Sequence, residues 1–587
     1  MRARNILTRG EVSPISEPRA HPLLDFFREL PGAGKRFWVL VLVTGAAAGL
    51  GAVLMVWLLA AVEHLVWPPG GTFLGEVSAA SPTRTLVVTV AAGLLVVLAS
   101  LLYRHPLGGH GTAGLLEAIW LKSGRVPFVR TVVRGVISIV VVGMGAPLGR
   151  EGALLQFGAA TGSKLAQRMR VKPDQVRLLV ACGASAGIAA AYNVPIGAAL
   201  FGLEVLLGSF ALELFGPVVV SCVVATVISR VLIADHPTYV IPHRSMLHPT
   251  ELLVALALGP VLGVASAIYN RTLNGFAQLF EAIPLKLRMP LPILSMALVG
   301  VAAVWLPGIL GNGYDAVNLA LLGELPLSLL IVLPLAKLLG TSITSASGIP
   351  GGLFTPSLFF GALIGGALGQ GVLALFPHLG SPTGFALLGM SAILAGTTHA
   401  SVSAVLIIFE LTGSYEVILP LMVVSVSAAL VSRWIEPDSL YSAVLRRRKV
   451  KVPDALRPEW LRGISVRALM TGDADQVGAA ASFNDVVIRL LELSIGHDLY
   501  VTDSHGLLQG VIVLDELKGH LPDHALLQMT IAADLMNPVA PLRTDMSLAE
   551  VAHHFSETDV ERLPVVDAHR RLIGAVAKRD VLRHVRF

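Results

Sequence analysis

An arginine and a glutamate stand next to each other inside an otherwise apolar stretch of this chain. They are Arg150 and Glu151, in the segment GAPLGREGALLQ at residues 145–156. An ionised side chain at membrane depth costs about 2.5–3.5 kcal/mol on insertion scales, so residues of this kind usually mark an ion path. Three glycines surround the pair and would let the backbone approach a ligand closely. The alternative is that Glu151 is only a structural partner of Arg150.

Two other glycine-rich segments stand where apolar helices are expected to begin. They are GGHGTAG at 108–114 and SGIPGGLFTP at 347–356. The start of a helix offers free backbone N–H groups and the positive end of a dipole, and it therefore attracts anions. Three converging helix starts would bind an anion without a fixed full charge, weakly enough to release it again. The pattern predicts a path for anions.

The composition indicates a membrane protein. Hydrophobic residues make up 54% of the 587 positions and charged residues only 14%, against about 25% charged in soluble domains. Apolar runs near the roughly 20 residues that span a bilayer recur along the chain. We expect spans at 37–61, 85–103, 131–145, 213–234, 251–269 and 416–432. Shorter runs broken by Gly or Pro, which indicate helices that end partway through the bilayer, lie at 108–122, 151–167, 194–208 and 353–376.

The charged flanks predict how the chain is oriented. The first 36 residues lack the short apolar core and cleavage site of a signal peptide. Basic residues there, and the cluster that begins at Arg446, place both termini in the cytoplasm by the positive-inside rule. We expect a multi-pass protein of the plasma (inner) membrane, and we attribute the net charge of +5 to these flanks rather than to nucleic-acid binding. Cys182 and Cys222 form no CxxC or disulfide pattern.

The membrane part contains an internal repeat. GASAGIAAAYNVPIGAALFGLE starts at Gly183 and GMSAILAGTTHASVSAVLIIFE starts at Gly389, and each ends on a glutamate, Glu204 and Glu410. Small residues recur at matching steps, which allows close helix packing. Two halves with broken helices are typical of a transporter whose binding site lies at the membrane midplane. We interpret the two glutamates as structural groups hydrogen-bonded at helix ends.

The composition changes at about residue 445. A basic linker, 446–462, leads into sequence typical of a soluble α/β fold. VTDSHGLLQGVIVLDEL and LPVVDAHRRLIGAVAKRDVL share the order short strand, polar turn, β-branched strand, helix, which makes them a second internal repeat. The predicted organisation is an N-terminal segment at 1–36, a membrane domain at 37–445, the linker at 446–462, and two copies of the α/β unit at 463–520 and 530–587.

Four motifs make the chain resemble the CLC family of chloride channels and chloride/proton exchangers. They are GREG at 149–152, GGLFTP at 351–356, FELTGSY at 409–415 and SLYSAVL at 439–445. The tail resembles the CBS domain pair that follows many such membrane domains. The resemblance implies an all-α polytopic membrane domain with two inverted-topology repeats of broken helices, then cytoplasmic α/β tandem CBS domains. It also implies a homodimer in the lipid bilayer with one pore per subunit, chloride as the transported ion and no required cofactor.

The resemblance assigns roles to individual residues. Glu151 would be the gating glutamate, whose side chain competes with the anion. The anion-binding groups would be Arg150 and Gly152 beside the outer site, the N–H groups of Leu353 and Phe354 at the central site, and the hydroxyl of Tyr441 on the inner side. An interfacial aromatic anchor is the alternative role for Tyr441.

Two positions depart from the family's pattern. His110 stands where the family usually has a serine that binds the anion, which leaves the anion preference open; the alternative role for His110 is a helix cap. Val205 follows Glu204 where exchangers usually carry a second, proton-accepting glutamate. We therefore predict a channel gated by Glu151. The alternative is a chloride/proton exchanger, and fluoride or nitrate transport is a further alternative.

The tail predicts at most weak nucleotide binding. CBS pairs often bind adenine nucleotides (ATP, ADP or AMP) through a strand that ends in a threonine and an aspartate. Asp580 is retained in the second copy, whereas Ala577 replaces the threonine; the first copy has Val513 and Glu516 at these positions. Asp580 and Glu516 are thus candidate nucleotide ligands, and a purely structural tail that stabilises the dimer is the alternative.

Hydrolase activity is not expected. GASAG matches the GxSxG nucleophile pattern around Ser185, but that motif needs a strand before the serine, and the surroundings here are an alanine-rich apolar helix. GNGYD contains Asp315, and no second aspartate in an apolar segment pairs with it. The sequence contains neither the HExxH zinc motif nor a phosphate-binding Walker A loop. We predict that the protein is not an enzyme and holds no metal.

Overall fold

The computed structural model forms two compact units, Met1–Val452 and Pro453–Phe587. The structure describes residues 33–103, 111–233, 239, 249–284, 287–413, 415–448, 466–472, 474–492, 498–513, 530–544, 546, 550–551, 554–555 and 560–585. Each unit is described by itself.

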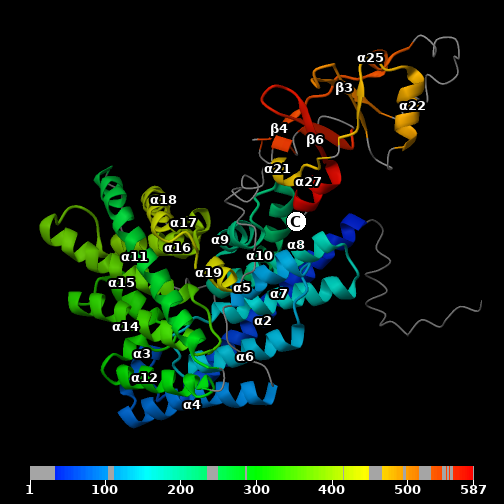
Figure 1. Cartoon of the computed structure of the whole chain (residues 1–587). Coiled ribbons are helices and arrows are strands. Elements are labelled where there is room, and N and C mark those ends of the chain that lie inside the picture. The colour runs from blue at the N-terminus through cyan, green and yellow to red at the C-terminus, as the bar shows by residue number, and fades with distance from the viewer. Residues whose placement is uncertain are drawn as a thin grey trace, which may run out of the picture. The chain divides into compact units, whose positions relative to one another are not determined.

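The first unit is helical in its described part (Figure 1). The elements of its first half are α2 (Ala33–Val66), α3 (Phe73–Ala79), α4 (Pro82–Tyr103), α5 (Gly111–Leu121), α6 (Phe128–Gly143), α7 (Glu151–Arg168), α8 (Pro173–Tyr192), α9 (Pro195–Phe201), the π-helix η1 (Gly202–Leu207) and α10 (Leu212–Leu232). The second half contains α11 (Pro249–Ala282), α12 (Leu291–Trp305), the 3-10 helix η3 (Pro307–Ile309), α13 (Tyr314–Leu322), α14 (Leu327–Ala346), α15 (Phe354–Leu375), α16 (Pro382–Thr398), α17 (Ser401–Thr412), η4 (Tyr415–Val417), α18 (Ile418–Ile435) and α19 (Ser442–Arg447).

Eight helices of the described residues are long and apolar enough to cross a membrane. Five of the predicted spans are confirmed, within α2, α4, α10, α11 and α18. The span expected at 131–145 is wrong, because α6 has only 16 residues and is shorter than a bilayer requires. Conversely, α15 is an unbroken helix of 22 residues where a broken segment was expected. Two further membrane-capable helices, α8 and α14, are not among the predicted spans. α8 is rich in small residues, and 89% of its apolar window is buried inside the protein.

The predicted repeat is confirmed by matching helix pairs. In the first half α7 packs on α8, and in the second half α15 packs on α16. A Cβ added to Gly158 would stand 1.9 Å from the carbonyl oxygen of Gly183, and one added to Gly361 would stand 2.5 Å from that of Gly389. Glycine at these steps is what allows both backbone contacts.

The two glutamates that end the repeats hold the halves together. Glu204 accepts hydrogen bonds from the N–H groups of Val402 (3.4 Å) and Ser403 (2.8 Å) at the start of α17. Glu410 accepts from Ile196 (3.0 Å) and Gly197 (2.6 Å) at the start of α9. Each carboxylate thus satisfies the free N–H groups of a broken helix in the other half. This agrees with the prediction that both are structural groups at helix ends.

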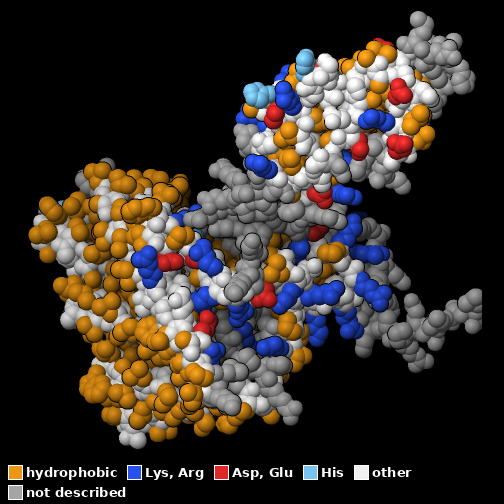
Figure 2. All heavy atoms as spheres, viewed as in Figure 1, with side chains coloured by type: hydrophobic (Ala, Val, Ile, Leu, Met, Phe, Trp, Pro, Cys, Tyr) orange, Lys and Arg blue, Asp and Glu red, His pale blue; other side chains and the backbone are white. Residues whose placement is uncertain are grey.

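The surface of the first unit is what a lipid bilayer requires. Hydrophobic side chains cover the outer faces of α11, α12 and α14 (Figure 2). Exposed large side chains on these helices include Leu256, Val261, Val264, Leu298, Val332 and Leu335. In lipid these apolar groups need no protein partner, and the polar backbone is satisfied inside each helix. The protein is therefore an integral membrane protein.

The second unit contains two copies of one small sheet. β1 (Gln476–Gly478) pairs in parallel with β2 (Leu499–Thr502), which pairs antiparallel with β3 (Leu508–Ile512); β4 (Leu542–Arg543), β5 (Arg562–Val566) and β6 (Leu572–Ala577) repeat this order. The helices are α21 (Val466–Leu469), α22 (Phe483–Glu492), α25 (Ala532–Leu535) and α27 (Lys578–Val585). The repeat predicted from the sequence is confirmed.

The turns between the paired strands repeat in atomic detail. Asp503 Oδ1 accepts from the N–H groups of His505 (2.8 Å) and Leu507 (2.9 Å). Asp567 Oδ1 accepts from His569 and Arg571 at the same two distances. These N–H donors favour the ionised carboxylate and lower the pKa of both aspartates.

The two copies also exchange their leading segments. Val466 and Leu469 of α21, which precede the first sheet in the sequence, are buried in the core of the second copy with Leu563. Ala532 of α25, which precedes the second sheet, is buried in the core of the first copy with Val501. The copies therefore depend on each other to complete their cores.

The reciprocal caps lead to a stability prediction. Glu410→Ala removes the acceptor for two N–H groups at the start of α9, and losing a helix cap costs about 0.5–2 kcal/mol. We expect the melting temperature of the detergent-purified protein to fall by several degrees. Glu416→Ala, on the short helix η4, is the control, and an equal shift in both variants would contradict the role of Glu410.

Candidate anion site

Glu151 is the first residue of α7, and its carboxylate contacts the first turn of α15. Its Oε1 accepts hydrogen bonds from the N–H groups of Phe354 (2.8 Å) and Thr355 (3.1 Å). Its Oε2 accepts from the hydroxyl of Thr355 (2.7 Å), and the hydroxyl of Tyr192 lies 3.5 Å away. Glu151 is 4% exposed. A buried carboxylate thus occupies the place where the free N–H groups of a helix start would bind an anion.

Two glycine loops cross beside this carboxylate. The N–H of Gly149 donates to the carbonyl oxygen of Gly352 (2.9 Å), and the N–H of Gly352 donates to the carbonyl oxygen of Gly149 (2.8 Å). A Cβ on Gly149 would stand 2.0 Å from Glu151 Oε2, and one on Gly352 would stand 2.2 Å from Oε1. Gly152 fits close to the same crossing, since its Cβ would stand 3.0 Å from the Cα of Gly352. The missing side chains make the room that Glu151 fills.

Arg150 and Glu151 do not form an ion pair, although they are neighbours. The guanidinium of Arg150 donates to the carbonyl oxygen of Ala191 (3.3 Å) and lies 5.2 Å from the ring centre of Tyr314. Its backbone N–H donates to the side chain of Asn312 (3.1 Å). The alternative in which Glu151 is only the structural partner of Arg150 therefore lacks the contact it needs.

An aromatic row connects the Glu151 site to Tyr441. The ring of Phe354 packs on Tyr192 and on Phe201, and Phe201 packs edge-on against Tyr441 with ring centres 6.2 Å apart. Tyr441 is 5% exposed and belongs to the buried core of the first unit. This burial disagrees with the alternative in which Tyr441 is an interfacial anchor.

Two of the three predicted helix starts are confirmed, because α7 and α15 begin at Glu151 and Phe354; α5 is helical from Gly111, the first described residue of that segment. Of the two N–H groups predicted for the central anion, that of Phe354 contacts the carboxylate. The N–H of Leu353 makes no such hydrogen bond within the described chain, because Leu353 precedes the first helical residue. Thr355 supplies the second donor instead.

Sequence reasoning missed a buried lysine that supports the site. Lys337 on α14 is 1% exposed, and its ammonium donates to the carbonyl oxygens of Ile309 (3.0 Å), Leu310 (3.4 Å) and Gly311 (2.9 Å). It thereby fixes the loop that presents Asn312 to Arg150. A lysine inside an apolar span was the available signal, since such residues are rare and functional.

Comparisons with known proteins identify the family. The family described as voltage gated chloride channel matches residues 89–433. A ClcB-like chloride channel protein from Ralstonia nicotianae is 33% identical over 431 residues, which cover 71% of this chain and 99% of the relative. The chain belongs to the CLC family. The CBS domain family also matches, at residues 532–586.

Solved structures agree with this CLC assignment in their fold. A slow cyanobacterial Cl⁻/H⁺ antiporter has a TM-score of 0.64 at 23% identity and covers 70% of this chain and 97% of its own. A eukaryotic CLC transporter has a TM-score of 0.60 at 18% identity and covers 95% of this chain and 98% of its own. CLC proteins are channels or transporters and not enzymes, which confirms the prediction that this chain is not an enzyme. Ser185 of the GASAG motif is buried in the middle of α8.

The structure does not test the predicted roles of three positions, His110, Glu516 and Asp580. His110 and Glu516 lie outside the described residues. Asp580, in the first turn of α27, lies 3.9 Å from the guanidinium of Arg579. The nucleotide role of the last two stays a prediction.

The room beside Glu151 leads to a prediction for this CLC site. In Gly149→Ala the new methyl group would collide with the carboxylate, which is the movable neighbour. We expect Glu151 to leave the start of α15 and anion flux at neutral pH to rise several-fold. Gly371→Ala in α15, where a Cβ meets nothing within 4 Å, is the control. Unchanged flux, with Glu151 still at α15 in the variant's structure, would contradict this account.

Proposed function

We propose that the protein conducts chloride across the membrane through a pore that the carboxylate of Glu151 closes. The observation that carries the proposal is the pair of hydrogen bonds from Phe354 and Thr355 to that carboxylate. A helix start that binds a carboxylate offers the same donors to a chloride ion. Glu151 and the permeating anion therefore compete for one site.

Opening requires that Glu151 leave the site. The ionised carboxylate is held by N–H and hydroxyl donors. Protonation removes the charge and weakens these bonds, so an anion then replaces the side chain. Flux should accordingly rise as the pH falls.

The inner side favours a channel over an exchanger. Val205, on the π-helix η1, cannot carry a proton, and the neighbouring Glu204 has its oxygens engaged at the start of α17. A proton crossing from Glu151 toward the inner face therefore lacks a carboxylate relay at this position, and an isolated charge in an apolar region is costly. The chloride/proton exchanger is the second candidate, because the solved antiporter named above has the same fold.

The family supports a proposal for the assembly, and the charged flanks of the chain support one for its location and orientation. We propose a homodimer with one pore per subunit, with both termini in the cytoplasm and the protein in the plasma (inner) membrane. Tyr441 would face the anion from the inner side, His110 would stand at the position of the usual anion-binding serine, and Arg150 with Gly152 would border the outer site.

An adenine nucleotide would bind the CBS pair weakly, with Asp580 on the ribose. Fluoride or nitrate transport is a further candidate because His110 replaces a serine.

The gate is tested by Glu151→Gln in liposomes. The neutral amide cannot act as an anion at α15, so we expect high chloride flux at neutral pH and loss of most of the pH dependence. Glu416→Gln is a charge-matched control away from the site. If Glu151→Gln keeps the wild-type pH profile, Glu151 is not the gate.

Channel and exchanger are separated by paired flux measurements. Liposomes with a steep chloride gradient are monitored with a pH electrode and a chloride electrode, with no other proton path. We expect chloride movement without uphill proton movement. Sustained uphill proton movement that Glu151→Ala abolishes would establish the exchanger instead. The same liposomes loaded with fluoride or nitrate would rank the anions.

A further inference from the structure

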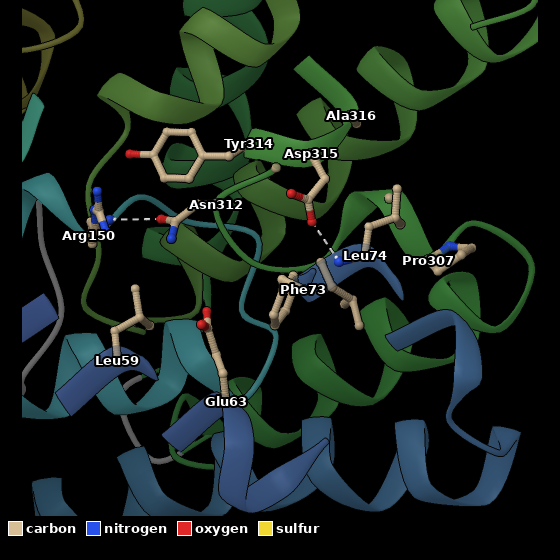
Figure 3. Close-up of a pocket in the computed structure, with 13 residues that line it drawn as sticks. Leu59, Glu63, Phe73, Leu74, Arg150, Pro307, Asn312, Tyr314, Asp315 and Ala316 are labelled. Atoms are coloured by element: carbon tan, nitrogen blue, oxygen red, sulfur yellow. Dashed lines mark hydrogen bonds between the residues drawn. The ribbon is translucent and has the colours of Figure 1, made fainter. Parts of the chain in front are cut away.

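A cavity of about 130 Å³ lies beside Arg150, the chain neighbour of Glu151, and Arg150 is one of the residues that line it (Figure 3). Its walls come from the end of α2, the start of α3, and the segment from η3 into α13. The polar groups that line it include Glu63, Arg150, Asn312, Tyr314 and Asp315. Apolar walls from Leu59 and Phe73 complete it.

Arg150 brings a positive charge to this cavity, which the carboxylates of Glu63 and Asp315 also line. Its side-chain contacts are a carbonyl oxygen and an aromatic ring, and it forms no ion pair within the described residues. Its buried Nε has no hydrogen-bond partner. A guanidinium with free donors at a cavity wall is suited to binding an anion.

Glu63 faces the same cavity from the last turns of α2 (Figure 3). Its carboxylate makes no hydrogen bond or ion pair within the described part of the chain. Asp315, across the cavity, is engaged by the N–H of Leu74 (2.7 Å). Glu76 lies 3.4 Å from His64 and does not line the cavity. Of the two carboxylates that line the cavity, Glu63 is therefore the one that forms no hydrogen bond within the described residues.

The charged groups around Glu63 come from several elements. They include Arg150 beside the start of α7, Glu76 on α3 and Asp315 on α13. His64 is on α2 itself, and the exposed Arg84 of α4 donates to the carbonyl of Val66 at the end of α2 (2.8 Å). Among the described residues that line the cavity, Arg150 is the one cation.

We propose that this cavity is an antechamber that binds a permeating halide through Arg150, and that ionised Glu63 opposes that binding. The halide and the carboxylate act on the same guanidinium, so Glu63 lowers halide occupancy while it is charged. Protonation of Glu63 at acidic pH removes the repulsion and fills the antechamber. The protein therefore has a second acid-responsive carboxylate, which acts on anion entry, whereas Glu151 acts on the gate. This inference rests on the proposed anion conduction.

The test uses the full-length protein in the Glu151→Gln background, where the gate no longer responds to pH. Chloride binding by calorimetry and chloride flux from liposomes are measured at neutral and acidic pH. Adding Glu63→Gln should tighten chloride binding and raise flux several-fold at neutral pH, with little change at acidic pH. Glu63→Ala should have the same effect, so the test can still be made if one of these two variants folds poorly. Glu63→Asp keeps the carboxylate and should keep the pH response.

Glu416→Gln is the matched control, because it removes the same charge on η4, away from the cavity. If Glu63→Gln and Glu416→Gln give the same affinities at both pH values, the antechamber role is overturned. Failure of the proposed function has a different signature, since Glu151→Gln liposomes would then carry no chloride at all. That result would overturn the antechamber together with the conduction on which it rests.

Discussion

The rest of the first unit depends on one contact, between the carboxylate of Glu151 and the first N–H groups of α15. The first N–H groups of any helix have no partner within the helix, and a buried helix start must find one elsewhere. Here the partner is a side chain at the start of α7. An anion can satisfy the same donors, so under the proposed gating the side chain and the ion compete for one site.

Close backbone approach makes this contact possible. Gly149 and Gly352 pair through two hydrogen bonds, and a side chain at either would occupy the place of the carboxylate. In the same way, glycines that face each other let α7 pack closely on α8 and α15 on α16. Glu204 and Glu410 then fix the broken helices of one half against the other. Small residues and crossed caps together hold the site rigid.

The two cations near the site, Lys337 and Arg150, are held by uncharged groups. Lys337 is held by three carbonyl oxygens and the ring of Phe359, and Arg150 by a carbonyl oxygen and the ring of Tyr314. Neither ammonium nor guanidinium is neutralised by a carboxylate within the described residues. The guanidinium of Arg150 keeps its charge in this setting, and a positive field raises the local concentration of anions. Glu63 lines the same cavity as Arg150.

The sequence by itself determined the family, the two internal repeats and two of the helix starts, because glycine-rich breaks and apolar runs are local patterns. It also indicated that Glu204 and Glu410 end helices. Only the tertiary structure decided what each group touches. Glu151 meets Thr355, 204 positions away, and Lys337 meets a loop that carries no charge. Such contacts depend on how distant segments cross, and no periodicity encodes that crossing. For the same reason the exchange of leading segments between the two CBS copies could not be predicted.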